Sequence, residues 1–322
     1  MPPLLEIKNL TVTFDTDEGP VTAVNNLSLA LDQGQVLGLV GESGCGKSVT
    51  AMSILRLLPQ PSTRVTSGQI FFHGHDLLQI PVPELQAIRG RRISMIFQEP
   101  MTALSPLHRI GNQLAESLQI HRNMPHKQAW PIATHWLKRV GLPDAEERMY
   151  AYPHQLSGGQ RQRVMIAMAM MLDPALLIAD EPTTALDVTV QAQIFDLMQE
   201  MHKKNTGMLF ITHDMGAIWE MCTHVAVMYA TEIVETGTVH DVFNHPQHPY
   251  TKALLAAIPA HAEPGRPLPA IPGTVPSPRN IPPGCHFHDR CPFAFETCRV
   301  QHPKLYPTAS GQSRCFLSED AP

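Results

Sequence analysis

Residues 41–48 have the spacing Gly-x-x-x-x-Gly-Lys-Ser, which is typical of a phosphate-binding loop. Glycines let such a loop bend until its backbone N–H groups converge on phosphate oxygens. Lys47 would place a positive charge on the β- and γ-phosphates, and the Ser48 hydroxyl can ligate Mg²⁺. An apolar strand pattern (36–40) precedes the loop and a helical pattern (48–58) follows, so a phosphate would lie at a helix N-terminus. The predicted ligands are Gly41, Glu42, Ser43, Gly44, Cys45, Gly46, Lys47 and Ser48.

Two adjacent carboxylates end a second apolar strand pattern, at 175–179. Asp180 is placed to hold Mg²⁺, directly or through water, and Glu181 is placed to polarise an attacking water. Taken alone, the pair is equally well explained as a solvated strand end. Together with the phosphate loop, it predicts hydrolysis of a nucleoside triphosphate.

A third motif, Leu-Ser-Gly-Gly-Gln at 156–160, precedes a helical pattern, and Ser157 is a good N-cap. The order of the motifs, with the carboxylate pair about 20 residues after this one, resembles that of the ATP-binding-cassette (ABC) ATPases over roughly residues 4–258. In that family the motif reaches across a dimer to the γ-phosphate bound by the other subunit. The resemblance implies that role for Ser157, Gly158, Gly159 and Gln160.

The resemblance extends to further residues, although a lone glutamine or histidine would more often be structural. Gln98 matches the glutamine that senses Mg²⁺ and water and couples to membrane subunits, and His213 matches the switch histidine at the γ-phosphate. Ala185-Leu186-Asp187 matches the loop that is exchanged across the dimer. Phe14 is the candidate for stacking on adenine, although it could equally be a core residue.

Alternating strand and helix patterns must position these residues. Expected strands are 4–14, 23–31, 36–40, 69–72, 93–97, 175–179, 208–212 and 225–229, and expected helices are 48–58, 110–120, 127–140, 162–172 and 188–204. This alternation predicts an α/β fold with a mainly parallel sheet. The resemblance adds detail: a P-loop cassette with a RecA-like core, an antiparallel β subdomain, and a helical insertion at about 100–172.

The composition is that of a globular protein, with 43% hydrophobic and 16% charged residues among 322. A net charge of −5 without a basic block gives no reason to expect nucleic acid as a partner. The first ten residues do not read as a signal peptide, and no apolar run approaches the roughly 20 residues that cross a bilayer. We therefore expect a cytosolic chain with reduced thiols, which other subunits would hold at any membrane.

The composition changes near residue 259. Twelve of the 30 prolines lie at 259–307, and four of the six cysteines lie beyond residue 280. We predict a cassette at 1–258 and a Pro-rich C-terminal extension at 259–322, in which 259–283 form an extended linker and the remainder a small appendage. Cys45 lies in the phosphate loop, and Cys222 is expected to pack a helix.

The extension narrows the resemblance to ATPases of dipeptide and oligopeptide (peptide/nickel) importers. The supporting segments are His-Pro-Tyr-Thr at 248–251, Ala-Leu-Leu at 253–255, Pro-Gly-Thr-Val-Pro at 272–276, and the cysteine spacing with Arg290 before Cys291. Residues 228–231 depart from the family pattern, because Thr231 stands where glycine is usual. That position is expected at a strand end away from the phosphates.

Cys285, Cys291, Cys298 and Cys315 fall within 31 residues and can hold a metal. Thiolates suit Zn²⁺ or an iron–sulfur cluster, and the C-x-x-C spacing usual for structural zinc is missing. Loose spacing on a Pro-rich loop favours a [4Fe–4S] cluster, which the resemblance also implies. Zinc, unliganded thiols and disulfides remain alternatives. His286 and His288 are alternative ligands, but we expect them to be surface histidines.

The resemblance implies an ATPase at the cytoplasmic face of the cell inner membrane. Its partners would be a second ABC ATPase subunit, expected to be a paralogue, two transmembrane permease subunits and an extracytoplasmic peptide-binding protein. Other cargoes (nickel, a glycopeptide fragment or an opine) remain open, as does the pairing of like or unlike cassettes. Rival readings are an ABC ATPase without a transporter and a redox sensor in which ATP is regulatory.

Overall fold

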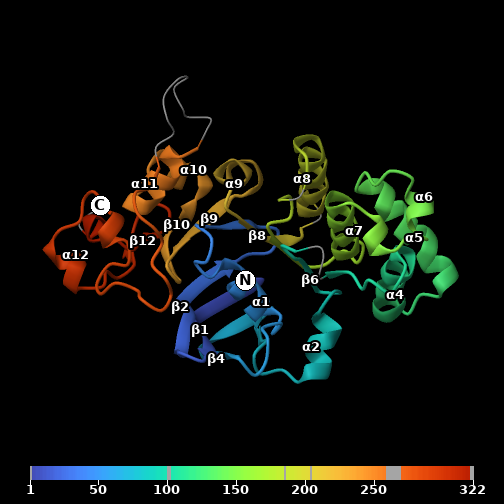
Figure 1. Ribbon diagram of the computed structural model, residues 1–322, viewed down its shortest axis with the longest axis horizontal. Helices are drawn as coiled ribbons and strands as arrows, with labels where there is room; N and C mark the ends of the chain where they lie inside the picture. Colours follow the sequence, from blue (N-terminus) through green and yellow to red (C-terminus); the bar gives the residue numbers. More distant parts are fainter. Residues whose placement is uncertain (1, 100–102, 185, 204, 259–269, 320–322) are drawn as a thin grey trace. The chain divides into compact units, whose positions relative to one another are not determined.

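The computed structural model describes residues 2–99, 103–184, 186–203, 205–258 and 270–319. The chain forms two compact units, each described by itself below. The first contains Met1–Leu31, Val36–Leu78 and Phe210–Pro322, and the second contains Asp32–Gln35 and Gln79–Leu209. Figure 1 labels the elements of both. Residues 259–322 are called the tail below, and its described part is 270–319.

An antiparallel sheet in the first unit has the strand order β2-β1-β4-β5. Its strands are β1 (Leu5–Thr16), β2 (Gly19–Leu31), β4 (Thr63–Phe72) and β5 (His75–Asp76). Leu5 lies opposite Leu31 on one side and Phe72 on the other. This confirms the predicted hairpin, whose two strands extend further toward the turn than expected. β4 begins six residues earlier than predicted, because the mostly polar segment 63–68 also pairs with β1.

The strand that leads into the phosphate loop, β3 (Val36–Val40), is buried along its whole length. It runs parallel to β9 (His224–Tyr229), and β9 pairs antiparallel with β10 (Glu232–Thr238), which the sequence analysis missed. Two short strands of the tail extend the sheet beyond β10. β12 (Gln312–Ser313) pairs with β10, and β11 (Tyr306–Pro307) pairs with β12. Part of the tail is therefore built into the sheet.

Short helices complete the first unit. They are α1 (Lys47–Ile54), α9 (Met215–Met221), α10 (Val239–Asn244), α11 (Pro249–Ala256) and α12 (Glu296–Val300), with single turns at His288–Arg290 and Phe316–Ser318. α1 ends four residues before the predicted limit. Arg56 takes a left-handed backbone conformation (φ 50°), which ends a right-handed helix there.

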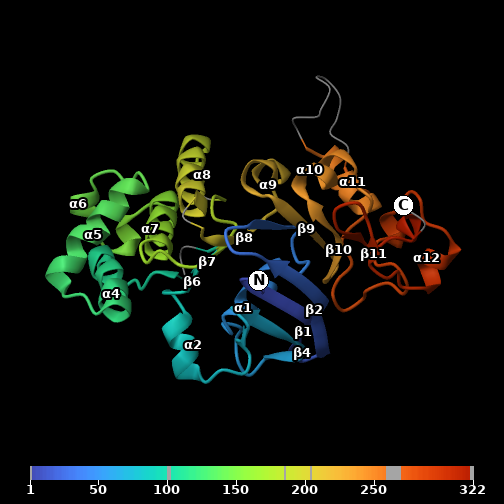
Figure 2. The same cartoon turned by 180° about the vertical axis from the view of Figure 1, so that it is seen from behind.

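The second unit is mainly helical. Its parallel strands β6 (Ile93–Ile96) and β7 (Leu176–Asp180) are accompanied by α2 (Val82–Ile88), α4 (Ile110–Arg122), α5 (His126–Arg139), α6 (Ala145–Arg148), α7 (Gly158–Met170) and α8 (Val188–Lys203). β8 (Gly207–Thr212) spans the division between the units. Figure 2 shows α4, α5, α6 and α7 gathered on one side of this unit.

α4 and α5 confirm the two helices predicted there. α7 begins at Gly158, four residues before the predicted start, because Ser157 caps it. Among the described residues, no helix has both the length and the apolar character needed to cross a bilayer.

Candidate functional site

The phosphate loop connects β3 to α1 and depends on its glycines in two ways. Gly44 and Gly46 have positive φ values of 82° and 108°, which side chains other than hydrogen disfavour. Gly41 has no room for a Cβ, which would collide with the carbonyl oxygen of Met228. Gly46 also forms the N-cap of α1. The loop can therefore present backbone N–H groups at the start of a helix, as the sequence predicts.

Lys47 is the buried cation of this loop. Its Nζ donates hydrogen bonds to the carbonyl oxygens of Gly41 (2.8 Å) and Glu42 (3.1 Å). Burial raises the pKa of the neighbouring Cys45 thiol, and the charge of Lys47 partly offsets that rise. Ser48, the next residue of α1, is half-buried, whereas Ser43 and Gly44 are exposed. One positive charge and several exposed backbone groups thus meet in the loop.

The carboxylate pair lies where β7 ends, in the second unit. Asp180 is buried as the last residue of the strand. Glu181 has a left-handed backbone conformation (φ 47°), and its Oε2 accepts hydrogen bonds from Gln98 Nε2 and Thr184 Oγ1, both at 3.2 Å. The structure therefore brings together two residues that the sequence assigned separately, the expected base and the expected water-sensing glutamine.

The Leu-Ser-Gly-Gly-Gln segment forms the start of α7. Ser157 Oγ accepts the N–H of Gln160 (3.3 Å), and Gln160 Oε1 accepts the N–H of Ser157 (3.0 Å), which completes a capping box. Ser157 and Gly158 are exposed, so the N-terminus of this helix faces outward. Further along the helix, Gln162 Nε2 donates to the carbonyl oxygen of Pro182 (2.7 Å), which fixes α7 to the residue after Glu181.

The remaining predicted positions are placed as follows. His213 follows β8 and is exposed, and Phe14 lies half-buried on β1, so it is not a core residue. Asp187 Oδ1 accepts the N–H of Val190 (3.0 Å) at the start of α8. Ala185 of the predicted exchanged loop lies outside the described residues. Phe14, His213 and the phosphate loop belong to the first unit, and Gln98, Glu181 and Asp187 belong to the second.

The turn after β9 requires a correction. The sequence places Thr231 away from the phosphates, but its N–H donates to the carbonyl oxygen of Cys45 in the phosphate loop (3.2 Å). The reason is topological. β9 runs parallel to β3, so both strands end at the loop. Ala230 and Thr231 have φ values of 42° and 77°, the conformation in which glycine is usual.

The four cysteines of the tail gather in one region. Cys298 and Cys315 are buried, and Cys285 and Cys291 are half-buried. Burial raises the pKa of Cys285 to about 12 and that of Cys315 to about 11, and the charges of the other thiols add to both shifts. All six cysteines are free thiols in this structure. Cys222 is buried at the end of α9, in agreement with a packing role.

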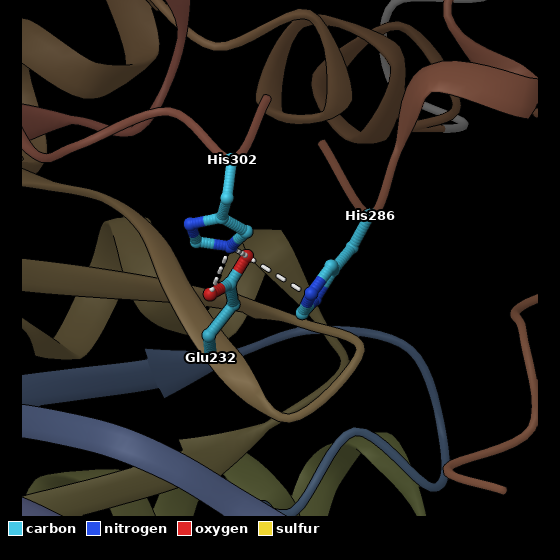
Figure 3. Close-up of side chains that lie close together, drawn as sticks. All are labelled: Glu232, His286 and His302. Carbon is cyan, nitrogen blue, oxygen red and sulfur yellow. Dashed lines mark hydrogen bonds and ion pairs between the residues drawn. The ribbon is translucent and has the colours of Figure 1, made fainter. Parts of the chain in front are cut away.

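A cluster of possible metal ligands joins β10 to the tail (Figure 3). Glu232, on β10 and 3% exposed, faces His302 Nε2 at 2.9 and 3.0 Å and His286 Nδ1 at 3.2 Å. Two observations favour a hydrogen-bonded anchor over a cation site. Arg314 Nε already lies 3.5 Å from the same carboxylate, and His286 Nδ1 faces the Ala230 carbonyl oxygen at 3.1 Å, where it would carry a proton.

The prediction that His286 and His288 are surface residues is therefore wrong. Both are buried, because each ring has polar partners inside the tail or on β10. Nδ1 of His288 lies 2.8 Å from the carbonyl oxygen of Cys285. A histidine with such partners can be buried at little cost. The local sequence does not predict these partners.

Comparison with known proteins identifies the family. A family model described as "ABC transporter" matches residues 24–184, and one described as "Oligopeptide/dipeptide transporter, C-terminal region" matches residues 234–298. The second match covers the end of the cassette and three of the four cysteines of the tail. The two matches thus span both parts of the chain that the sequence analysis singled out.

Three similar proteins illustrate the relationship. The oligopeptide transport ATP-binding protein OppD of Haemophilus influenzae is 48% identical over 322 residues, which cover 99% of each chain. The dipeptide transport ATP-binding protein DppD of Bacillus subtilis is 47% identical, covering 99% of this chain and 96% of its own. The solved dimeric structure of MJ0796, a bacterial ABC transporter cassette, is 26% identical with a TM-score of 0.67, covering 73% of this chain and 98% of its own.

The loop at 41–48, the capped segment at 156–160 and the carboxylates at 180–181 all lie within residues 24–184, which the "ABC transporter" model matches. The chain belongs to the ATP-binding proteins of ABC transporters and carries the C-terminal region of the oligopeptide and dipeptide transporters.

Proposed function

We propose that this chain is the ATP-hydrolysing subunit of an ABC importer for dipeptides and oligopeptides. The observation that carries the proposal is the joint presence, in one chain, of a complete set of cassette motifs and the oligopeptide/dipeptide C-terminal region. In this proposal it works at the cytoplasmic face of the cell membrane. Its partners are a paralogous ABC ATPase subunit, two transmembrane permease subunits and an extracytoplasmic peptide-binding protein.

Each cassette motif then has a role in ATP hydrolysis. Lys47 and the N–H groups of the phosphate loop bind the phosphates, and Ser48 and Asp180 would hold Mg²⁺, which supplies neutralising charge. Glu181, with Gln98 bonded to its carboxylate, orients the attacking water.

The remaining residues act in the site of the partner cassette, at the γ-phosphate, across the dimer and at adenine. The exposed start of α7, at Ser157 and Gly158, completes the site of the partner cassette. His213 contacts the γ-phosphate, Asp187 contributes to the exchange across the dimer, and Phe14 stacks on adenine.

We further propose that Cys285, Cys291, Cys298 and Cys315 hold a structural [4Fe–4S] cluster. The sequence spacing of the four thiols lacks the C-x-x-C pair usual for structural zinc, and thiolates are also the ligands of iron–sulfur clusters. A bound cluster would add folding energy to a Pro-rich segment.

Uptake measurements test the cargo. Cells that lack this chain are complemented with the wild type or with Glu181→Gln and offered labelled dipeptides, oligopeptides or nickel. The proposal expects peptide uptake with the wild type and none with the variant. If nickel uptake is restored without uptake of any peptide, nickel replaces peptides as the proposed cargo. If uptake of none of these solutes is restored, a function outside transport is favoured.

Iron analysis tests the cluster. Anaerobic purification should give about four irons per chain, and Cys298→Ser should lower iron content and the stability of the tail. Cys222→Ser, which removes a buried thiol outside the tail, should keep the iron. Stoichiometric zinc without iron would support the alternative metal. Loss of ATP hydrolysis by Cys298→Ser in a complex that remains assembled would contradict a structural role.

A further inference from the structure

The tail reaches the phosphate loop through a single buried arginine. Arg290, in the short turn at His288–Arg290, has a side chain that is only 5% exposed. Its Nη1 lies 2.8 Å from Glu42 Oε2, and its Nη2 lies 3.1 Å from Glu42 Oε1, so the two groups form a bidentate pair. Glu42 is the second residue of the phosphate loop, and 248 positions separate it from Arg290.

The arginine is also held by two residues of the tail and by one residue of β9. Nε donates to the carbonyl oxygen of Pro272 (2.8 Å), and Nη1 lies 3.4 Å from the Tyr229 hydroxyl. The guanidinium carbon also lies 5.7 Å from the centre of the Tyr229 ring and 5.9 Å from that of Phe287. With its planar group held by a carbonyl, a hydroxyl and two rings, Arg290 presents its two Nη atoms to Glu42 in one orientation.

Glu42 is held at its backbone too. Its N–H donates to the Tyr250 hydroxyl (3.0 Å), and its carbonyl oxygen accepts from Lys47 Nζ (3.1 Å). The carboxylate is about a third exposed, whereas the N–H and carbonyl are tied to α11 and to the lysine of the loop. A change at the Glu42 side chain is therefore transmitted to the backbone that carries Lys47.

The charge of Glu42 creates a problem that Arg290 solves. A carboxylate in a loop that binds a triphosphate repels its own ligand, and the repulsion is strong where the surroundings are partly dry. A bidentate arginine both cancels this charge and turns the carboxylate toward the tail. Without the arginine, the carboxylate would be left half-buried without its counter-ion, free to rotate toward the phosphates.

We propose that Arg290 is a positioning residue of the ATP site, which makes nucleotide affinity depend on the folded tail. The inference rests on the proposed role of residues 41–48 as the ATP-binding loop. It is independent of the cargo and of what the four cysteines bind. The coupling has a definite direction: a tail that withdraws Arg290 weakens ATP binding through the freed carboxylate of Glu42.

Equilibrium binding of a fluorescent ATP analogue with Mg²⁺ to the full chain tests the proposal. Arg290→Gln should weaken binding about tenfold, equivalent to about 1.4 kcal/mol. The affinity of Arg290→Lys should lie between that of the wild type and that of Arg290→Gln, because lysine keeps the charge but cannot form the bidentate pair. The double variant Glu42→Gln/Arg290→Gln should recover most of the lost affinity, since no carboxylate remains to repel the nucleotide. Arg299→Gln, at an exposed arginine of α12, is the matched control and should bind as the wild type does.

The outcomes separate this proposal from the assignment of the site. Lys47→Ala provides the reference loss of affinity, and if it binds as tightly as the wild type the phosphate loop itself is wrongly assigned. If Lys47→Ala loses affinity and Arg290→Gln does not, the site stands and the role of Arg290 is wrong. If the double variant binds as weakly as Arg290→Gln, the loss comes from damage to the tail and the charge argument fails. Iron content and thermal stability of each variant identify such damage directly.

Discussion

The Gln98 amide donates a hydrogen bond to the Glu181 carboxylate, with 3.2 Å between Nε2 and Oε2. The Thr184 hydroxyl donates to the same oxygen at the same distance. Two neutral donors, an amide and a hydroxyl, therefore orient the carboxylate. An ionised, oriented carboxylate is the form that a base for water requires.

Replacement of that carboxylate should separate ATP binding from ATP turnover. Glu181→Gln keeps the shape of the side chain and removes the base, so we expect ATP to be bound and turnover to fall by about 10²-fold or more. The rate is measured in the assembled transporter, with the partner cassette varied separately because its own site can give residual activity. Glu84→Gln, which removes an exposed carboxylate on α2, should leave the rate unchanged. Turnover near that of the wild type would remove Glu181 from the mechanism.

Thr231→Gly should stabilise the protein. Thr231 combines a φ of 77° with a fully buried side chain whose hydroxyl has no hydrogen-bond partner among the described residues. Relief of the left-handed conformation and of the buried hydroxyl is worth about 1–2 and 1–3 kcal/mol. The two lost carbons, Cβ and the methyl, cost about 1.6 kcal/mol, and the added freedom of glycine costs about 0.5–1 kcal/mol.

The expected net gain for Thr231→Gly is about 1 kcal/mol, seen as a higher midpoint of thermal unfolding. Thr22→Gly, at a position of β2 that pairs with Thr13 of β1, serves as the matched control and should lower the midpoint. A lower midpoint for Thr231→Gly as well would show that the packing of the threonine outweighs its backbone strain.

His248 should make the protein less stable in mild acid. Burial lowers its folded-state pKa to about 3, and the charges of Arg314 and Lys252 act in the same direction. The neutral ring accepts the N–H of Tyr250 at the start of α11 (3.0 Å). Because the unfolded pKa is about 6.5, the unfolded chain binds the extra proton between about pH 6.5 and 3. The stabilisation is therefore complete above pH 6.5 and is lost as the pH falls through this window.

His248→Asn tests this pH dependence, since asparagine can also cap a helix and does not titrate. The stability advantage of the wild type over the variant should shrink by about 1.4 kcal/mol between pH 7.5 and 5.5. The gap is followed as the difference between their unfolding midpoints at each pH. His75→Asn, at an exposed histidine of β5, should show no such shrinkage. A gap that stays constant for His248→Asn would mean that the folded ring binds a proton as readily as the unfolded chain does.

The phosphate loop could be predicted because its chemistry is contiguous. Residues 41–48 carry glycines, lysine and serine in one run, between a short apolar strand and a helix. The capping box at Ser157 is equally local. The hairpin of β1 and β2 followed from alternation along the strands, whose buried face was visible in the sequence.

β10 could not be predicted because buried acids interrupt its apolar pattern. Glu232 and Glu235 are both buried, and their partners come from elsewhere in the chain. His302 lies against Glu232, and Glu235 accepts the N–H groups of Gln247 (2.7 Å) and His248 (2.9 Å). An acid without its partner predicts an exposed position, so the strand can be recognised only once residues 247–248 and the tail are folded against it.

The pairing of β12 with β10 also bears on how the protein avoids other chains. Glu235 and Thr236 of β10 lie opposite Ser313 and Gln312 of β12, on the side of β10 away from β9. A strand with one unpaired side is a template for the backbone of a second molecule. The tail occupies that side at these residues. If the tail detached from β10, the strand would expose an unpaired edge to other chains. Self-association would then follow from the same event that frees the Glu42 carboxylate.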